Sequence, residues 1–320
     1  MGWIVSVADR VRAGGLVAEG RPVVVLLSGG RDSVCLLDVA VGLGADVTAL
    51  HVDHGLRGAA SDADAAFCAG LCERLGVPFA LRRAPRRPAS GNLQAWAREV
   101  RYGAALELAG RRGADVATGH TATDQVETVL YRLAASPGRR ALLGMAARDG
   151  PLVRPLLGCT REETAAHCIA RGLAWREDAS NDALAFARNR VRHALLPALR
   201  AIHPAADANV LRTLELLRDE AAVLDAVLDA ALAEAGDPPA AAALRALPPA
   251  LRRLGLQRLA DRAAGGRAPS IGHRTDEVLA LAEGGALDVG GGLRAQVRGG
   301  AVRFGASRGP AAPHPDRGAA

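Results

Sequence analysis

A short polar segment, Ser-Gly-Gly-Arg-Asp-Ser at residues 28–33, follows five apolar residues and precedes an apolar run of helical length. This pattern predicts a buried strand, a tight loop and a helix. Two glycines permit positive φ and a close approach to a phosphate, and a helix N-terminus offers free N–H groups to an anion. Ser28 and Ser33 add hydroxyls, and Asp32 can cap the helix or bind Mg²⁺. The segment therefore predicts an anion-binding loop.

The loop differs from two common phosphate-binding motifs, since the chain contains neither G-x-x-x-x-G-K-S/T nor G-x-G-x-x-G. An ordinary glycine-containing turn capped by Asp or Ser is the alternative, which the full six-residue pattern after an apolar strand disfavours. The loop resembles that of the PP-loop ATP pyrophosphatases, which cleave ATP into AMP and pyrophosphate. By itself this resemblance implies only that superfamily.

Two more polar clusters follow predicted strands. Residues 53–57, Asp-His-Gly-Leu-Arg, come after a strand at 47–52, and Gly119 to Asp124 come after a strand at 115–118. Another strand at 77–81 and helices at about 62–75 and 93–110 alternate with these. Such alternation predicts an α/β fold with a doubly wound, mostly parallel sheet. Ligands of these sheets bind beyond the carboxyl ends of the strands, where all three polar clusters fall.

The amino-acid composition excludes some classes of catalytic mechanism. The chain has 320 residues, 49% hydrophobic and 3% aromatic, with a net charge of +6, and all 40 of its Lys and Arg residues are arginine. Catalysis through a Schiff-base lysine or a lysyl-AMP intermediate is therefore excluded. An arginine-rich surface suits phosphate and RNA, although charge alone does not distinguish such a protein from any basic one.

The cysteines indicate a reducing compartment. The five residues include no C-x-x-C pair, and Cys68 and Cys72 have the i,i+4 spacing of buried thiols on a helix. The sequence contains no signal peptide and no apolar run of transmembrane length. We therefore predict a cytoplasmic protein without a membrane partner.

The middle of the chain carries a second set of candidate residues. A Gly- and Pro-containing connector at 138–157 precedes a helix at 160–171 with a capping box. Arg188 and Arg192 follow at i,i+4 spacing, so they share one helix face. Two interpretations stay open: a clamp on phosphate or RNA, and a solvated basic helix paired with Asp178 and Asp182.

Periodicity divides the chain into three parts. Residues 1–205 form the predicted ATP-binding catalytic domain. Leucines then recur at helical spacing, and two short β-like pieces follow near the end, so residues 206–305 form a mainly helical domain with a terminal hairpin. Residues 306–320 are rich in Gly, Pro and Ala, which predicts a disordered tail.

Several motifs together resemble the tRNA(Ile)-lysidine synthase family over most of residues 20–200. The matching segments are residues 28–33, 51–57, 97–102, 119–128, the Arg-Pro-Leu-Leu segment at 154–157, and the block at 177–192. The last block separates this family from other PP-loop proteins. The resemblance implies an adenine-nucleotide α-hydrolase-like fold followed by a smaller helical, tRNA-contacting domain.

The family converts the wobble cytidine of an isoleucine tRNA with a CAU anticodon into lysidine. It adenylates the cytosine C2 oxygen with ATP, releasing pyrophosphate, and the ε-amine of free lysine then attacks C2 and displaces AMP. The implied ATP-binding residues are Ser28, Gly29, Gly30, Arg31, Asp32, Ser33 and Gly119. The implied Mg²⁺ ligands are Asp32 and Asp124, and the residues implied to face the reacting groups are His120, Arg188 and Arg192.

Lysine must lose a proton before it attacks, so a carboxylate or histidine is needed as a base, and Glu127 and His120 are the candidates. The cytosine must be unstacked to be read on its edge. Phosphate contacts are expected from the Arg-rich loop at 82–87 and from the second domain.

The chain departs from the family where two adjacent Asp commonly precede Gln125, because Thr123 takes the first position. This departure keeps a catalytically impaired, RNA-binding relative as an alternative. A PP-loop tRNA thiolase is another, disfavoured by the missing C-x-x-C. The sequence is compatible with a homodimer and does not decide the oligomeric state.

Overall fold

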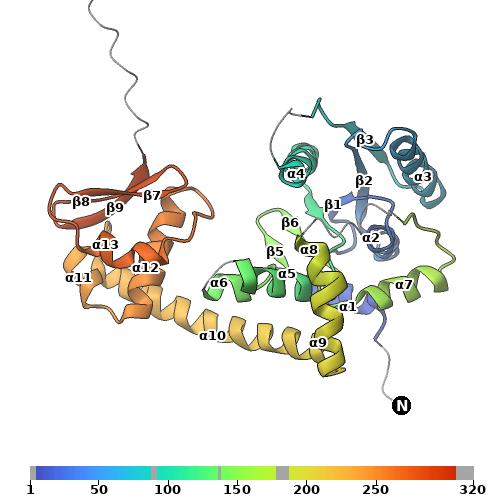
Figure 1. The fold of residues 1–320 in the computed structure, drawn as a ribbon. Helices are drawn as coiled ribbons and strands as arrows, with labels where there is room; N and C mark the ends of the chain where they lie inside the picture. The colour runs from blue at the N-terminus through green and yellow to red at the C-terminus, as the bar shows by residue number, and fades with distance from the viewer. Residues whose placement is uncertain (1–4, 88–91, 136–137, 178–186, 308–320) are drawn as a thin grey trace, which may run out of the picture. The chain divides into compact units, whose positions relative to one another are not determined.

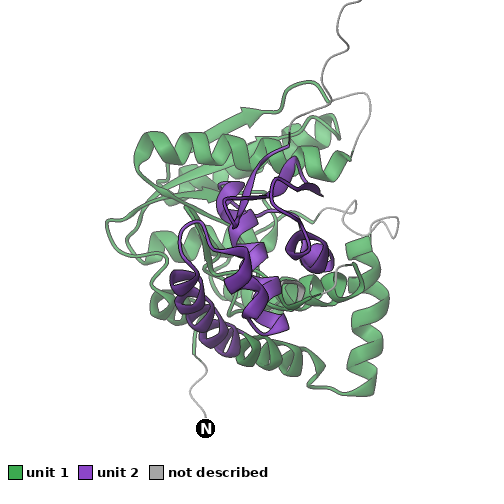
Figure 2. Cartoon of the chain, turned by 90° about the vertical axis from the view of Figure 1, so that its left-hand side faces the viewer, with its two compact units in different colours: residues 1–217 green, residues 218–320 purple. Residues whose placement is uncertain are grey.

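The computed structural model describes residues 5–87, 92–135, 138–177 and 187–307, and the chain divides into two compact units, residues 1–217 and 218–320 (Figures 1 and 2). The predicted partners Asp178 and Asp182 lie outside the described residues, as do positions 308–320 of the predicted tail. Among the helices described, none combines the length and hydrophobicity that crossing a membrane requires.

The first unit is built on one sheet. Its described strands are β1 (Pro22–Leu26), β2 (Asp46–Asp53), β3 (Phe79–Arg83), β4 (Asp115–Ala117), β5 (Arg148–Asp149) and β6 (Leu152–Val153). They lie in the order β3-β2-β1-β4-β6-β5, and every neighbouring pair is parallel except β5 and β6. The predicted mostly parallel sheet is confirmed. Strand order reverses between β1 and β4, which is where doubly wound sheets bind ligands.

Helices cover both faces of this sheet. The helices described before residue 178 are α1 (Val7–Gly14), α2 (Arg31–Gly42), α3 (Ala59–Leu75), α4 (Leu93–Arg112), α5 (Ala122–Ala135), α6 (Arg139–Leu142) and α7 (Arg161–Ala170), of which α6 contacts α5. Val23 and Val25 of β1 pack in a core with residues of α1, α2, α3 and α7, whereas Val24 and Leu26 pack with α4 on the other face (Figure 1). Because successive side chains of a strand point to opposite faces, a strand buried on both sides reads as a continuous apolar run.

The segment at 138–157 holds more structure than the predicted connector. It contains α6 and the antiparallel pair β5 and β6, and β6 extends the sheet by pairing in parallel with β4. Strands of two residues are too short to produce a hydrophobic period, so the sequence carried no signal for them.

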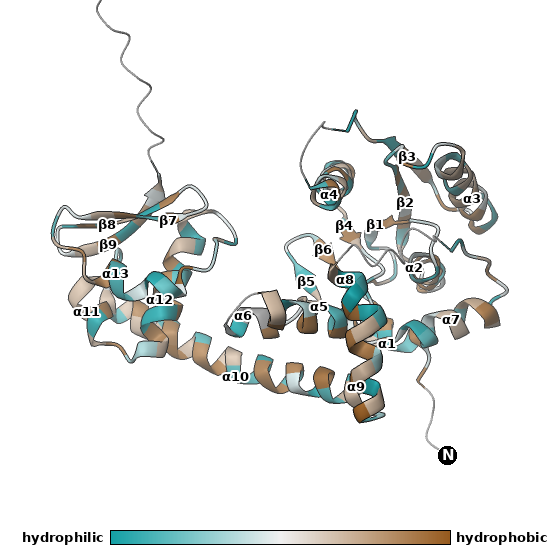
Figure 3. Ribbon diagram, in the orientation of Figure 1, coloured by the Kyte–Doolittle hydropathy of each residue, from teal (hydrophilic) through white to brown (hydrophobic). Residues whose placement is uncertain are grey.

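A helical segment completes the first unit. The helix α8 (Ala187–Arg190) continues through a π-helical turn at Val191–Leu195 into α9 (Leu196–Ile202), and α8 and the π-turn contact α5. The long helix α10 (Ala206–Ala235) follows, with hydrophobic and polar residues interspersed along its length (Figure 3).

The second unit has its own core. Its elements after α10 are α11 (Ala241–Ala246), α12 (Pro249–Ala263), α13 (Thr275–Leu279), β7 (Ala286–Gly290), β8 (Leu293–Arg298) and β9 (Ala301–Ala306). The three strands form an antiparallel sheet in that order, so the predicted hairpin of β8 and β9 gains β7 as a third strand. Leu244, Leu256 and Ile271 are fully buried in this core.

Candidate functional site

The loop between β1 and α2 folds around the hydroxyl of Ser33. That hydroxyl donates to the carbonyl of Gly30 at 2.8 Å, accepts from the N–H of Ser28 at 3.2 Å, and lies 3.1 Å from the Ser28 hydroxyl. Gly29 has φ of +84°, as expected for a residue that must turn the chain. Gly30 has φ of −73°, so of the two glycines only Gly29 uses the positive φ that both permit. The first-turn N–H groups of α2 begin directly after this loop.

Gly119 brings the end of β4 onto the start of α2. A Cβ built on Gly119 would lie 3.0 Å from the carbonyl of Asp32 and from the nitrogen of Ser33, so no other residue fits without moving one backbone. The two loops predicted to meet at the carboxyl edge therefore do meet, and the glycine makes the contact possible. His120 and α5 follow directly.

Three carboxylates and three guanidinium groups meet at this edge. We call them the carboxylate–arginine cluster: Asp32, Asp124, Glu127, Arg161, Arg188 and Arg192. They come from α2, α5, α7, α8 and the π-helical turn, which are separated along the chain. Five of the six were candidate residues from the sequence, and the sixth is Arg161.

Glu127 is the buried centre of the cluster, with none of its side chain exposed. Arg192 donates from Nε to Oε1 at 2.6 Å and from Nη2 to Oε2 at 3.0 Å, and Arg188 donates from Nε to Oε2 at 3.2 Å. The predicted shared face of Arg188 and Arg192 is confirmed by their common partner. Both arginines pair with a carboxylate of α5, so this face is not simply solvated, whereas the predicted pairing with Asp178 and Asp182 lies outside the described residues.

Asp124 is held ionised by its partners. Its Oδ2 accepts from the backbone N–H and the hydroxyl of Thr121, both at 2.9 Å, and its Oδ1 accepts from Arg161 at 3.1 Å and Arg188 at 3.3 Å. Burial by itself would raise the pKa of Asp124, but the nearby guanidinium charges and the Thr121 N–H outweigh it and lower the pKa. A negative charge therefore persists in a largely dry site.

His120 is neutral at pH 7. Burial, reinforced by the charges of Arg188, Arg154 and Arg101, lowers its pKa to about 4, although Asp124 acts in the opposite direction. Its Nδ1 lies 2.8 Å from the hydroxyl of Thr118. A neutral imidazole can accept or donate a hydrogen bond to an uncharged group without bringing another positive charge.

Two cations of this edge were not singled out from the sequence. Arg101 of α4 is largely buried, which lowers its pKa, and its charge acts on His120. Arg161 is the first residue of α7, where the helix dipole disfavours a cation. That unfavourable placement was the one signal in the sequence that Arg161 has another role.

Thr123 is 7% exposed and accepts a hydrogen bond from the backbone N–H of Arg161 at 3.3 Å. It therefore helps to fix the start of α7. Next to Arg161, Thr164 donates to Asp32 at 2.5 Å, so α7 also holds the acidic residue of the loop.

The cluster at 51–57 contributes less to this site. His51 is buried, with Nδ1 2.8 Å from the carbonyl of Leu27, and Asp53 accepts from the N–H of Gly55 at 2.8 Å to close a turn. Asp53 also lines a cavity of about 250 Å³ with Arg83, at the carboxyl ends of β2 and β3. Arg57 turns to Asp64 at 2.6 Å.

The carboxylates of the cluster would need the phosphates of a bound substrate to complete the coordination of a divalent cation. No group of three or more His, Cys, Asp or Glu side chains among the described residues is placed to hold a metal. Asp32 and Asp124 both face one cationic side chain, because Nε of Arg161 lies 3.6 Å from the first and Nη2 lies 3.1 Å from the second. Mg²⁺ is commonly held by one or two carboxylates together with substrate phosphates, so the chemistry of these two side chains suits it, and their role as its ligands stays a prediction.

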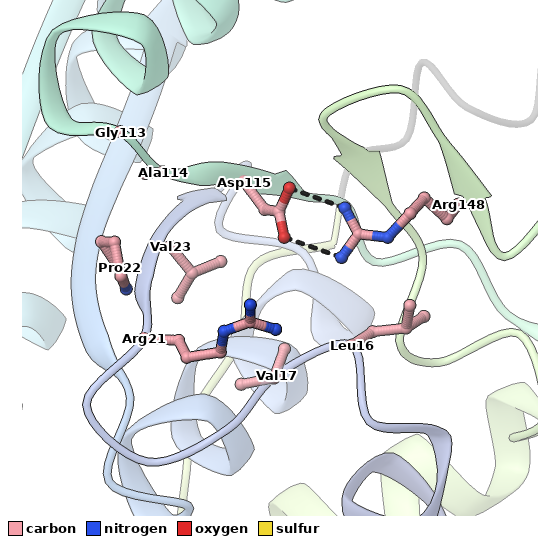
Figure 4. Close-up of a pocket in the computed structure, with 9 residues that line it drawn as sticks. All are labelled: Leu16, Val17, Arg21, Pro22, Val23, Gly113, Ala114, Asp115 and Arg148. Atoms are coloured by element: carbon pink, nitrogen blue, oxygen red, sulfur yellow. Dashed lines mark hydrogen bonds and ion pairs between the residues drawn. The ribbon is translucent and has the colours of Figure 1, made fainter.

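A cavity of about 510 Å³ lies at the opposite edge of the sheet, at the amino ends of β1 and β4 (Figure 4). Its polar lining includes Arg21 and the pair formed by Asp115 and Arg148, whose two hydrogen bonds both measure 2.8 Å. None of the candidate residues from the sequence lines it.

The chain is similar to known proteins along most of its first unit. A family model described as a PP-loop domain matches residues 7–199. The tRNA(Ile)-lysidine synthase of Solibacter usitatus is 43% identical over 230 residues, which are 69% of this chain and 52% of the relative. That of Nocardia farcinica is 44% identical over 232 residues, which are 70% of this chain and 72% of the relative. The chain spans about half the length of most of these curated relatives.

Among solved structures, the U34-tRNA thiolase NcsA of Methanococcus maripaludis has a TM-score of 0.56 at 19% identity, covering 66% of this chain and 78% of that one. At this identity the similarity concerns the fold.

Proposed function

Because the chain belongs to the tRNA(Ile)-lysidine synthase family of PP-loop proteins, we propose that it joins lysine to C2 of the wobble cytidine of an isoleucine tRNA with a CAU anticodon. The cytosine C2 oxygen attacks the α-phosphorus of ATP, and the bond to pyrophosphate breaks. The lysine ε-amine then attacks C2, the C2–O bond breaks, AMP leaves and the amine loses a proton. The observation that carries this proposal is the cluster of buried charges beside the PP-loop, in a chain of this family.

The loop and α2 suit the first step. Gly29, Gly30 and the first-turn N–H groups of α2 come directly after β1, at the carboxyl edge of the sheet where we propose that the phosphates bind. Asp32 and Asp124 would hold Mg²⁺, which supplies positive charge at the phosphates. Arginines in a dry site stabilise the charge that develops on the departing pyrophosphate. Gly119 permits the close packing of the two loops that this requires.

The second step needs a proton acceptor. His120 is neutral, and its low pKa makes it a weak base but a suitable hydrogen-bond partner. Glu127 has no water contact, and two arginines occupy both of its oxygens. Accepting a proton there would require Arg188 or Arg192 to move, so we assign Glu127 first to holding these two arginines.

RNA contacts are proposed at two places. Arg86 and Arg87 lie exposed in the loop after β3, and Arg253 and Arg262 lie exposed on α12 of the second unit. Such side chains suit phosphate contacts that orient a tRNA without reading bases.

Replacing Arg253 and Arg262 with Ala should weaken tRNA binding and reduce its salt dependence, as measured by filter binding at several salt concentrations.

The experiment that tests the function measures pyrophosphate release from ATP with Mg²⁺, free lysine and a tRNA transcript bearing CAU. A second transcript with the wobble cytidine changed is the control. We expect release only with the cytidine, together with incorporation of labelled lysine into the RNA. Tight tRNA binding without release would favour a non-catalytic relative, and sulfur incorporation without lysine would favour a thiolase.

The same assay tests the role of Asp32. Asp32→Ala should lower turnover by about 10³-fold, because the developing charge on the phosphates loses its metal. Affinity for tRNA should change less than about twofold, since the carboxylate makes no favourable contact with RNA. Turnover equal to that of the unmodified chain would contradict the proposed metal role.

A further inference from the structure

Arg161 joins the two halves of the site. Its guanidinium lies 3.6 Å from Asp32 of the PP-loop side, and 3.1 Å from Asp124 and 3.6 Å from Glu127 of the α5 side. The described hydrogen-bond and ion-pair partners of Asp32 are Arg31, Arg161 and Thr164, and of these Arg161 also pairs with carboxylates of α5. In the described part of the chain, Arg161 is thus the one guanidinium that pairs with carboxylates from both sides.

The backbone fixes this residue in place. The N–H of Arg161 donates to Thr123, and α7 is attached to α2 because Asp38 binds His167 at 2.8 Å and Arg171 at 3.1 Å. The Arg161 side chain is only 22% exposed. Its position is therefore set by two packed helices, which preserves the geometry of the cluster.

The two ends of this bridge differ in strength. Toward Asp124, Arg161 makes a hydrogen bond, whereas toward Asp32 it makes only a charge contact. The Nε that faces Asp32 is buried and has no hydrogen-bond acceptor. A buried donor without an acceptor is unfavourable. The contact of Arg161 with Asp32 is therefore weaker than its hydrogen bond to Asp124, and it breaks more easily.

From this geometry, and resting on the proposed function, we propose that Arg161 is a positioning residue that acts as a resident cation. It neutralises Asp32 and Asp124 while the site lacks nucleotide, and a divalent cation must compete with it for Asp32. Because its charge stays bonded to Asp124, it opposes tight binding of the cation alone. The phosphates of ATP add the negative charge that favours the cation, so metal and nucleotide bind together.

The test measures Mn²⁺ affinity of the full chain without nucleotide or tRNA, from the electron paramagnetic resonance signal of free Mn²⁺. Arg161→Gln should bind Mn²⁺ about tenfold more tightly, because a positive charge beside the carboxylates is removed. Arg148→Gln, which removes the same charge beside Asp115 at the amino edge of the sheet, should stay within twofold. Unchanged or weaker binding by Arg161→Gln, or an equal gain in Arg148→Gln, would overturn the proposal.

A second measurement needs no variant. Phenylglyoxal labels accessible guanidinium groups, and peptide mass spectrometry quantifies labelling of Arg161 in the unmodified chain. Labelling should rise when Mn²⁺ is added, since the cation takes Asp32 from the arginine, and constant labelling would contradict the proposal. Neither measurement involves tRNA or turnover, so its outcome is independent of whether lysidine forms.

Discussion

Two bidentate arginine–carboxylate pairs lie at opposite edges of the same sheet, and they differ in their exposure to water. At the amino edge, Arg148 binds both oxygens of Asp115, and the side chains are 43% and 28% exposed (Figure 4). At the carboxyl edge, Arg192 binds both oxygens of Glu127, which has no exposed surface. Both pairs are bidentate, but only in the second is the carboxylate fully removed from water, and its arginine is 22% exposed.

This difference in exposure to water distinguishes a surface ion pair from a candidate functional site. An exposed pair contributes little to stability because water competes for both charges. A buried cluster is costly to assemble, and its charges act strongly on whatever enters beside them. The low pKa of His120 and the lowered pKa of Asp124 occur at the second edge, where burial and several charges combine. The protein therefore concentrates its electrostatic effects at the edge that holds the PP-loop.

The largest expected effect comes from breaking the buried pair. Glu127→Gln removes the fully buried charge that Arg192 and Arg188 share and leaves Asp124 as their remaining described carboxylate, so the free energy of unfolding should fall by about 3 to 5 kcal/mol. Urea denaturation followed by circular dichroism measures it. A loss below about 1 kcal/mol would mean that the cluster is as hydrated as the amino edge.

The next effect concerns pH. Because the pKa of His120 is lowered to about 4 from an ordinary value of about 6.5, the unfolded chain binds more protons between these pH values. The contribution of His120 to stability is therefore complete above pH 6.5 and lost as pH falls to 4, by up to about 3 kcal/mol. His120→Asn should remove this rise of the free energy of unfolding with pH between 4 and 6.5, as measured by urea denaturation at several pH values. His273→Asn, which changes an exposed histidine of the second unit, should leave the rise unchanged. Equal slopes in all three proteins would contradict the buried state of His120.

Activity provides a third comparison. Arg192→Ala and Arg188→Ala should each lower pyrophosphate release by about 10²-fold, because each removes positive charge that is paired with the buried carboxylates of α5. Arg86→Ala and Arg87→Ala, which change exposed arginines, should alter it less than about threefold. Equal losses in both sets would indicate diffuse attraction of RNA rather than a shaped site.

The smallest effect is expected at the amino edge. Asp115→Asn should change the free energy of unfolding by less than about 1 kcal/mol and leave pyrophosphate release unchanged. Because Arg148 is exposed to solvent, water can hydrate its guanidinium once the negative charge of Asp115 is removed. A loss comparable to that of Glu127→Gln would show that exposure does not separate the two edges.

Local patterns predicted the elements that carry the site. The apolar run before Ser28 gave β1, the turn at Gly29 required positive φ, and the alternation of strands and helices placed the ends of β1 and β4 at one edge. The match of residues 7–199 to a PP-loop domain confirms the superfamily read from that loop. The short strands β5 and β6 and the third strand β7 were not predicted, since tertiary pairing rather than local period defines them.

The sequence by itself determined which residue types stand at the carboxyl edge, because runs of apolar residues, glycines and helix caps act over a few positions. Only the tertiary structure decided which guanidinium meets which carboxylate. Arg192 reaches Glu127 across 65 positions, and Thr164 reaches Asp32 across 132. Ion pairs over such separations depend on how α5 and α7 pack against the sheet. Arg161 was therefore not predicted as part of the site, although its own sequence neighbours were read correctly as a helix cap.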